Sequence, residues 1–413
     1  MSEHSWGLFE AFGVELEYMI VSRDTLSVAP LTDQLLHDVA GEFTSEIEMG
    51  PLCWSNELAL HVVELKTNGP VTTLDGVAQR FDEHVRQINR RLTRFNAQLM
   101  PSAMHPWMDP LRELQLWPHE YNAVYDAFHR IFDCRGHGWA NLQSVHINLP
   151  FADDDQFGRL HAAIRLLLPI LPALAASSPV VDRTVTGIAD NRLEVYRHNA
   201  DRIPSVAGLV VPEAVYTPAD YDREIFQVMY RDIAPLDPHG VLQHEWLNAR
   251  GAIARFDRNT IEIRVLDIQE CPDVDLAICQ VCVSVLQACV TERWTTFDQQ
   301  AAMPTAALAT VFDSCVRNAE RAAILDDQYL SMFGCVDRPT TAGQLWQHIC
   351  RQLQLSSAPI EAILSAGTLS TRIVRALACD TTPGQMVPHE QLEIVYRKLC
   401  HCLATGTMFD AAT

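Results

Sequence analysis

Residues 12–18 read FGVELEY and place two glutamates, Glu15 and Glu17, two positions apart in an otherwise apolar run. Side chains alternate between the two faces of a β-strand, so both glutamates would share one face, with apolar side chains on the other. Two carboxylates on one face repel each other unless a positive group lies between them. A salt-bridged arginine or a divalent cation would meet that need, and this stretch alone leaves the choice open.

Three further segments with strand character carry polar, mostly acidic residues among apolar ones. They are SNELALHVVELKTNGP from residue 55, with Glu57 and Glu64; LQSVHINLP from residue 142, with His146 and Asn148; and NTIEIRVLD from residue 259, with Glu262 and Arg264. Glu57 and Glu64 lie an odd number of residues apart, so one regular strand cannot present both on one face. Glu57 would therefore come from a loop or a bulge if both reach one site.

Taken singly, each glutamate is most simply a solvated residue on the wet face of an antiparallel sheet. The repetition over four segments instead favours a common floor made of five glutamates and one histidine. Oxygen ligands with a single imidazole suit Mg²⁺ or Mn²⁺, whereas zinc prefers thiolates or several histidines. The predicted metal ligands are Glu15, Glu17, Glu57, Glu64, His146 and Glu262.

Charge and hydropathy exclude several classes of partner. The chain of 413 residues has a formal net charge of −21, which disfavours nucleic acid, and any anionic substrate would need local cations. The first ten residues do not read as a signal peptide. The apolar stretch 164–181 is interrupted by Arg165, Pro169 and Pro172, which predicts a buried helix that kinks or ends at its prolines, not a membrane span. We expect a cytoplasmic protein without a membrane partner; the sequence leaves open whether it forms homo-oligomers.

The twelve cysteines are scattered along the chain. Cys279, Cys282 and Cys289 recur at helical spacing, which favours a role as small core residues. Cys400 and Cys402 lie close together but lack a second pair that would complete a zinc site. We expect free thiols throughout.

The coarse pattern predicts an α+β architecture. No G-x-G-x-x-G or G-x-x-x-x-G-K-[ST] phosphate loop follows the first strand, so an open sheet with helices packed on one face is favoured over a doubly wound parallel sheet. We expect residues 1–295 to form the catalytic domain and residues 296–413 a helical section packed on it. The predicted strands span 9–22, 57–67, 97–103, 143–151 and 259–269, and the predicted helices span 75–99, 156–178 and 273–294.

In this order, the segments resemble glutamate–cysteine ligases of the second bacterial type, also called carboxylate–amine ligases. The resembling blocks are FGVELEYMIVS, ELALHVVELKTNGP, AMHPW (103–107), SVHINLP, GIADNRLEVYR (187–197) and NTIEIRVLD. The resemblance implies a glutamine-synthetase-like fold, whose curved antiparallel sheet is the floor of an ATP site. It also implies an activity in which ATP and Mg²⁺ (or Mn²⁺) convert the γ-carboxylate of glutamate to an acyl phosphate, which an amine, first of all that of cysteine, then displaces. The product would be γ-glutamylcysteine, a precursor in glutathione biosynthesis.

The resemblance also implies individual roles. By motif position, the ion that bridges the ATP phosphates would be held by Glu15, His146 and Glu262, and the ion near the glutamate carboxylate by Glu17, Glu57 and Glu64. Arg264 would approach the transferred phosphoryl group as the catalytic cation, and Arg192 and Arg197 would bind the substrate carboxylate. The family often shows a second histidine where this chain has Asn148.

Three alternatives stay open. Related ligases use other amines on the same floor, so the acceptor need not be cysteine. A phosphotransferase related to guanidine kinases would transfer phosphate without forming an amide. A regulatory family member would bind nucleotide without turning it over.

Overall fold

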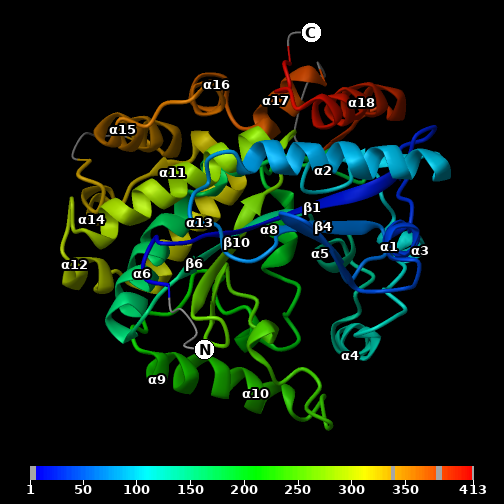
Figure 1. The fold of residues 1–413 in the computed structure, drawn as a ribbon. Helices are drawn as coiled ribbons and strands as arrows, with labels where there is room; N and C mark the ends of the chain where they lie inside the picture. Colours follow the sequence, from blue (N-terminus) through cyan, green and yellow to red (C-terminus); the bar gives the residue numbers. More distant parts are fainter. Residues whose placement is uncertain (1–5, 336–339, 378–383, 412–413) are drawn as a thin grey trace.

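The computed structural model describes residues 6–335, 340–377 and 384–411. In this part of the chain an eight-stranded antiparallel sheet occupies the centre of the molecule (Figure 1). Neighbouring strands pair in the order β2 (Glu46–Met49), β3 (Leu52–Asn56), β4 (Val62–Thr67), β1 (Gly13–Ser22), β6 (Ser144–Pro150), β10 (Thr260–Asp267) and β9 (Ala252–Arg255), and β5 (Ala97–Met100) pairs with β1.

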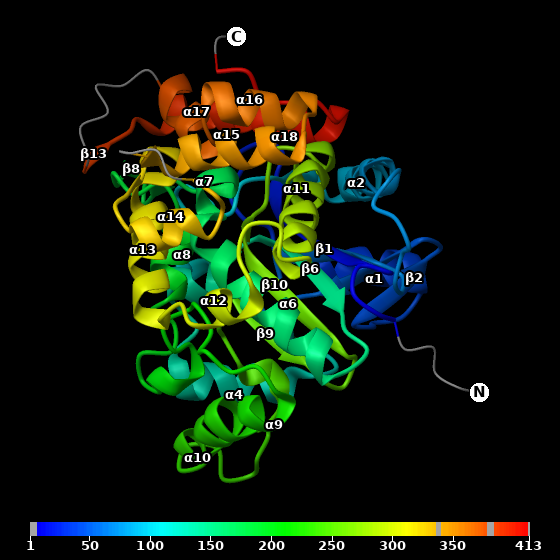
Figure 2. The same ribbon diagram turned by 90° about the vertical axis from the view of Figure 1, so that its left-hand side faces the viewer.

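Helices surround this sheet (Figures 1 and 2). They are α1 (Thr32–Ala40), α2 (Val77–Leu92), α3 (Pro110–Glu113), α4 (Asn122–Phe132), α5 (His137–Ala140), α6 (Asp154–Leu167), α7 (Pro172–Ala175), α8 (Asn191–Tyr196), α9 (Pro218–Tyr221), α10 (Gln227–Ile233), α11 (Pro272–Val290), α12 (Phe297–Ala301), α13 (Thr305–Asn318), α14 (Asp327–Ser331), α15 (Ala342–Leu353), α16 (Ala358–Ala366), α17 (Leu369–Ala376) and α18 (His389–Thr405). Short strands form two small sheets, one of β7 (Val180–Val181), β8 (Thr184–Val185) and β13 (Gln385–Met386), the other of β11 (Ala323–Ile324) and β12 (Thr340–Thr341).

Alternation in β1 divides the sheet into an apolar and a polar face. Val14, Leu16 and Tyr18 are fully buried in the main core. The apolar stripe of α2 joins the same core, and α11 packs against both α2 and α6. One face of the sheet is therefore covered by helices, which leaves the polar face for a site. The fold is α+β and glutamine-synthetase-like, as the sequence predicts.

The predicted elements are present, with shifted ends. The helix predicted over 75–99 ends at Leu92, where a 3₁₀ turn and Asn96, at a φ of 53°, lead into β5. The segment predicted as one helix over 156–178 is divided into α6 and α7, with a 3₁₀ turn from Leu168 between them, because prolines interrupt the helical hydrogen bonds. The prediction of a buried helix that ends at its prolines is confirmed. Strands β2, β3 and β9 are additional to the predicted set.

The described segments after residue 296 are mainly helical, with only the short strands β11, β12 and β13 among them. Helices α15–α18 lie together at one end of the molecule, opposite α9 and α10 (Figures 1 and 2). Helices α15 and α16 contact α11, and α18 contacts α2 and β5. Arg372 on α17 forms a buried ion pair with Glu270, which precedes α11. The proposed division at residue 295 thus runs between parts that share buried contacts.

Helix α11 is long and apolar enough to cross a membrane by length and composition, but 72% of the relevant window is buried inside the protein. Its three cysteines lie in the core, as predicted. Eleven cysteines fall in the described residues, and all are free and buried; Cys379 lies outside them.

Candidate active site

The strand register brings the polar side chains of four segments onto one face of the sheet. Glu15 lies opposite His146 on β6 and Lys66 on β4. Glu17 lies opposite Glu64. Glu262 on β10 lies opposite Asn148. The alternation in the sequence therefore places these side chains on one face of the sheet, which we call the polar floor.

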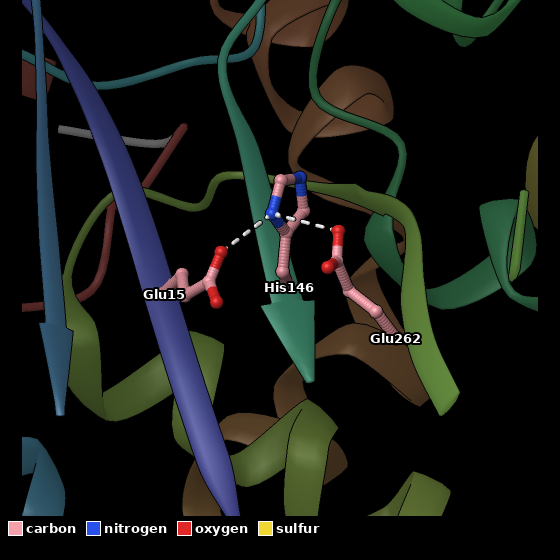
Figure 3. A group of neighbouring side chains, drawn as sticks. All are labelled: Glu15, His146 and Glu262. Carbon is pink, nitrogen blue, oxygen red and sulfur yellow. Dashed lines mark hydrogen bonds and ion pairs between the residues drawn. The ribbon is translucent and has the colours of Figure 1, made fainter. Parts of the chain in front are cut away.

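Glu15, His146 and Glu262 form the first group on this floor (Figure 3). One ligand atom from each of the three lies within 4.8 Å of the other two. His146 Nδ1 is 2.9 Å from Glu15 Oε2 and 3.6 Å from Glu262 Oε1. Asn148 Nδ2 donates a 2.9 Å hydrogen bond to the other oxygen of Glu15, which fixes the orientation of that carboxylate.

Glu17, Glu64 and His146 form the second group, again within 4.8 Å of one another. Ser144 donates to Glu17 from its backbone N–H (2.7 Å) and its hydroxyl (2.9 Å). Ser55 donates to Glu64 at 2.6 Å, and Lys66 Nζ lies 3.2 Å from the same carboxylate. Hydrogen-bond donors thus hold both carboxylates in place.

Glu57 follows β3 in the connection to β4, so it reaches the site from a loop, as its odd spacing from Glu64 requires. It lines the same cavity as the two groups. Burial, and then the charges of Glu17 and Glu64, raise the pKa of Glu57 well above its ordinary value.

The other carboxylates and the imidazole show how closely the charges interact. Burial opposes ionisation of Glu15, but its hydrogen bond to His146 and the charge of that residue hold the pKa of Glu15 below its usual range. Burial and the charge of Glu15 raise the pKa of Glu64 to about 7. Burial opposes protonation of His146, yet the hydrogen bond to Glu15 and the charges of Glu17 and Glu262 raise its pKa to about 9. Without a cation, the floor therefore retains protons at neutral pH.

Two arginines flank Glu262. Arg264 forms a close ion pair with it from two residues along β10, and Arg255 Nη1 on β9 lies 3.6 Å away. The register between β10 and β6 shifts between Ile263 and Leu266, so Arg264 lies in a β-bulge. Arg264 nevertheless lies on the polar floor with Glu262, two residues earlier on the same strand.

The two arginines predicted for substrate binding lie in different places. Arg192 lines the cavity, is 2% exposed, and pairs with Asp267, while its Nη2 has no hydrogen-bond partner. Arg197 instead pairs with Glu194 and Asp313 and does not line this cavity. It lies at the end of α8, where its side chain turns to α13. The structure brings Arg192 to the floor and does not bring Arg197.

Two cavities adjoin over the polar face. Cavity 1, of about 520 Å³, is lined by all six predicted metal ligands, by Arg192 and by Arg264. Cavity 2, of about 460 Å³, lies at the start of β1 and is lined by Phe12, Gly13 and the segment 66–70 among others. Glu15, Lys66 and Arg258 line both cavities, so Glu15 of the first group lies where the two meet.

The donor set fits hard divalent cations. Carboxylate oxygens predominate, one imidazole joins both groups, and the described cysteines are not among the clustered ligand atoms. Such a set suits Mg²⁺ or Mn²⁺. Because five carboxylates share one floor, a cation would also relieve their mutual repulsion.

Some residues of the site were not predicted. Ser144 shares a strand face with His146, so the period of two could have identified it. Arg255 belongs to β9, a strand of four residues that gives little sequence signal. A set of aromatic side chains on α4, α5 and the segment before β9 also lines cavity 1. These come from segments without strand alternation, and only the fold brings them to the site.

Comparison with known proteins gives consistent matches. The sequence profile of glutamate–cysteine ligase family 2 (GCS2) matches residues 11–395. An uncharacterised protein from Archaeoglobus fulgidus is 32% identical over 276 residues, 67% of this chain and 74% of its own length. A protein from Bradyrhizobium sp. (strain ORS 278), named provisionally as a glutamate–cysteine ligase 2, is 26% identical over 279 residues, 65% of this chain and 59% of its own length. This chain therefore spans about three fifths of that bacterial relative.

Two solved structures share the fold. The glutamate–cysteine ligase of Francisella tularensis in complex with AMP aligns with a TM-score of 0.59 and 12% identity, over 97% of this chain and 90% of its own. A bifunctional glutathione synthetase from Pasteurella multocida aligns with a TM-score of 0.53 and 14% identity, over 95% of this chain and 52% of its own.

Proposed function

The chain belongs to glutamate–cysteine ligase family 2, a family of ATP-dependent carboxylate–amine ligases, and from this premise we propose that it joins the γ-carboxylate of glutamate to an amine. The observation that carries the proposal is that four carboxylates and one imidazole cluster on the floor of cavity 1, which Glu57 also lines, and that Glu15 borders cavity 2 as well. Cysteine, which the family name suggests, and other amines are both candidate acceptors. We also propose a cytoplasmic location. The helical section from residue 296 would pack on the catalytic domain as part of the same enzyme.

The nucleotide would span the two cavities. Its triphosphate would lie at Glu15, His146 and Glu262, and its base and ribose would extend into cavity 2 beside Phe12 and Gly13. A side chain at Gly13 would press on Asn148, since a Cβ there would lie 3.1 Å from that residue's Cβ. The AMP bound by the Francisella ligase of the same fold supports a nucleotide site in this family.

Cations would be needed because a triphosphate and a carboxylate repel each other. Glu15, His146 and Glu262 would hold one Mg²⁺, and Glu17, Glu57 and Glu64 another. Bound Mg²⁺ supplies charge neutralisation at the phosphate oxygens. Arg264, which pairs with Glu262, would present its guanidinium to the transferred phosphoryl group.

Arg192 would bind the α-carboxylate of glutamate. Its Nη2 is buried without a hydrogen-bond partner, and Asp267 holds the rest of the guanidinium in place. Burial disfavours the cation, but Asp267 and then Asp190 raise the pKa of Arg192, so it stays charged. This orients the γ-carboxylate of the substrate toward the carboxylate floor.

The reaction would take two steps. A γ-carboxylate oxygen attacks the γ-phosphorus of ATP and releases ADP, which leaves an acyl phosphate. The amine, after losing a proton from its ammonium form, attacks the carbonyl carbon of the acyl phosphate; a C–N bond forms, the C–O bond to phosphate breaks, and phosphate leaves with the electron pair. A second proton leaves the nitrogen as the amide forms.

Hydroxylamine tests the first step independently of the natural acceptor, since this small nucleophile traps acyl phosphates. The protein is incubated with ATP, Mg²⁺, glutamate and hydroxylamine, and the hydroxamate is measured by mass. We expect γ-glutamyl hydroxamate and ADP in equal amounts, dependent on glutamate. ADP without hydroxamate would reject the proposed function, as would ADP formation that does not require glutamate.

A further inference from the structure

We propose that the amine acceptor of this enzyme is a primary amine carried on an apolar, aromatic-sized group without a carboxylate. This inference rests on the proposed function and concerns the substrate class of the same site. The proposed acceptor differs from an α-amino acid such as cysteine, because it carries no carboxylate. The relevant surface is the lining of cavity 1 away from the phosphate end.

Four aromatic side chains, Tyr125, Phe128, Trp139 and Trp246, line this part of cavity 1, and we call them the aromatic wall. The ring of Phe128 lies 5.1 Å from that of Trp139 and 5.8 Å from that of Trp246, so the rings brace one another. All four side chains are only half-buried. Each thus keeps part of its apolar surface available for a ligand to cover.

The aromatic wall adjoins the carboxylate group that would hold the glutamate. Asn56, next to Glu57 in sequence, donates a 3.0 Å hydrogen bond to the hydroxyl of Tyr125. The negative charge of Glu57 also contributes to a raised pKa of Tyr125, after burial. The Tyr125 end of the wall therefore flanks Glu57, whereas Trp246 follows Glu245, which pairs with Arg255. An amine that approaches the carbonyl carbon of the γ-carboxyl group from the Glu57 side would have its substituent against these rings.

The cations that line cavity 1 are already matched by carboxylates of the protein. Within the described residues they are Lys66, Arg192, Arg255, Arg258 and Arg264. Lys66 is paired with Glu46 and Glu64, Arg258 with Asp257, and Arg264 with Glu262. Arg255 is shared by Glu245, Asp257 and Glu262, and its buried Nε has no hydrogen-bond partner. Arg192 offers one buried Nη2, which the α-carboxylate of glutamate would use.

A carboxylate on the acceptor would consequently compete with these protein carboxylates for the cations, beside the aromatic rings and Glu57. Burial of an unpaired anion is costly, and the nearby carboxylates would repel it. An ammonium group is favoured there instead, both by the acidic floor and by the faces of the rings. The lining selects for an apolar amine and against its carboxylated counterpart.

The test compares amines that differ by that carboxylate. Phenethylamine is compared with phenylalanine, and cysteamine with cysteine, each with ATP, Mg²⁺ and glutamate, while hydroxylamine monitors acyl phosphate formation. We expect kcat/KM for phenethylamine to exceed that for phenylalanine and for cysteine by a factor on the order of ten or more. Cysteamine should likewise exceed cysteine.

The other outcomes are separable. Cysteine used as well as phenethylamine, or better, overturns the inference. Hydroxamate formation with no turnover of any of the four amines also overturns it and leaves the proposed function intact. Absence of hydroxamate would contradict both the inference and the proposed function.

A matched pair of variants locates the preference. Trp246→Leu should raise KM for phenethylamine about tenfold, because the ring surface is lost, while the hydroxylamine reaction loses less. Phe43→Leu changes an exposed aromatic residue that lines neither cavity and should leave KM for phenethylamine unchanged. Equal effects of the two substitutions would contradict a role for the aromatic wall.

Discussion

At the scale of single residues, the site is a balance of charges. Glu262 contacts His146, Arg255 and Arg264, so one carboxylate links the imidazole to both arginines of the phosphate end. Glu17 is held by Ser144 at the other end of the floor. Removal of either charge should leave the strands intact and remove the function.

Glu17→Gln and Glu262→Gln should each lower glutamate-dependent ATP turnover by a factor on the order of 10² or more, because each removes a charged ligand from the floor. Turnover is measured as phosphate release. Glu48→Gln, on an exposed position of β2 in the same sheet, is the matched control and should keep its rate. A near-normal rate for Glu262→Gln would show that this carboxylate is structural.

The two arginines of the DNRLEVYR stretch provide a second test. Arg192→Lys should raise KM for glutamate roughly tenfold, since lysine cannot present the planar fork to a carboxylate, with a smaller effect on KM for ATP. Arg197→Lys changes a side chain that pairs outside the cavity and should leave KM for glutamate as it is. A larger rise in KM for glutamate in Arg197→Lys than in Arg192→Lys would place the substrate carboxylate beside Arg197.

At the scale of elements, the position of Arg264 depends on the hairpin of β9 and β10. The backbone N–H of Arg264 donates to the carbonyl of Gly251 at 3.0 Å. A Cβ at Gly251 would lie 2.5 Å from Val265 Cγ1, so the bulge requires glycine there.

Gly251→Ala should therefore lower the free energy of unfolding by about 1–3 kcal/mol, because the stiff Val265 side chain must move. Urea unfolding measures the change. Gly136→Ala, at a glycine with no atom within 4 Å of the added Cβ, is the control and should stay within about 0.5 kcal/mol. Equal stability of both variants would contradict the packing argument.

The secondary-structure elements also show which features of the site can be predicted from sequence patterns. Alternation in β1 and β6 predicted which side chains share the floor, because a strand has one simple period. It could not reveal the bulge at Arg264, which depends on tertiary contacts with Gly251 and Val265. The orientation of Arg197 away from the cavity had no local signal either, because its partner Asp313 lies on α13. The aromatic wall comes from α4, α5 and a loop, whose convergence no local pattern encodes.

At the scale of the whole molecule, the net charge of −21 contrasts with a site that, in the proposed function, would hold a triphosphate and a carboxylate. The arginines, together with cations bound at the floor, would concentrate positive charge there. The core has its own charge constraint, because it encloses buried histidines, among them His61 and His161.

Stability should accordingly fall in mild acid. Burial lowers the pKa of both His61 and His161 to about 3, whereas an unfolded histidine titrates near 6.5. Below about pH 6.5 the unfolded state binds protons that the folded state does not, so each histidine should cost about 2 kcal/mol at pH 5. Urea unfolding at pH 7.5 and 5.0 measures the difference, and His161→Leu should reduce it by about that amount. An unchanged difference in the variant would mean that His161 is protonated in the folded protein.

The central claim is that the carboxylates and the imidazole of the polar floor bind divalent cations beneath a triphosphate. A crystal grown with Mn²⁺ and a non-hydrolysable ATP analogue tests it most directly through anomalous scattering. The account predicts one manganese peak at Glu15, His146 and Glu262 in contact with the phosphates, and another at Glu17, Glu57 and Glu64. Phosphates bound with no manganese at these carboxylates, or manganese bound elsewhere, would contradict it.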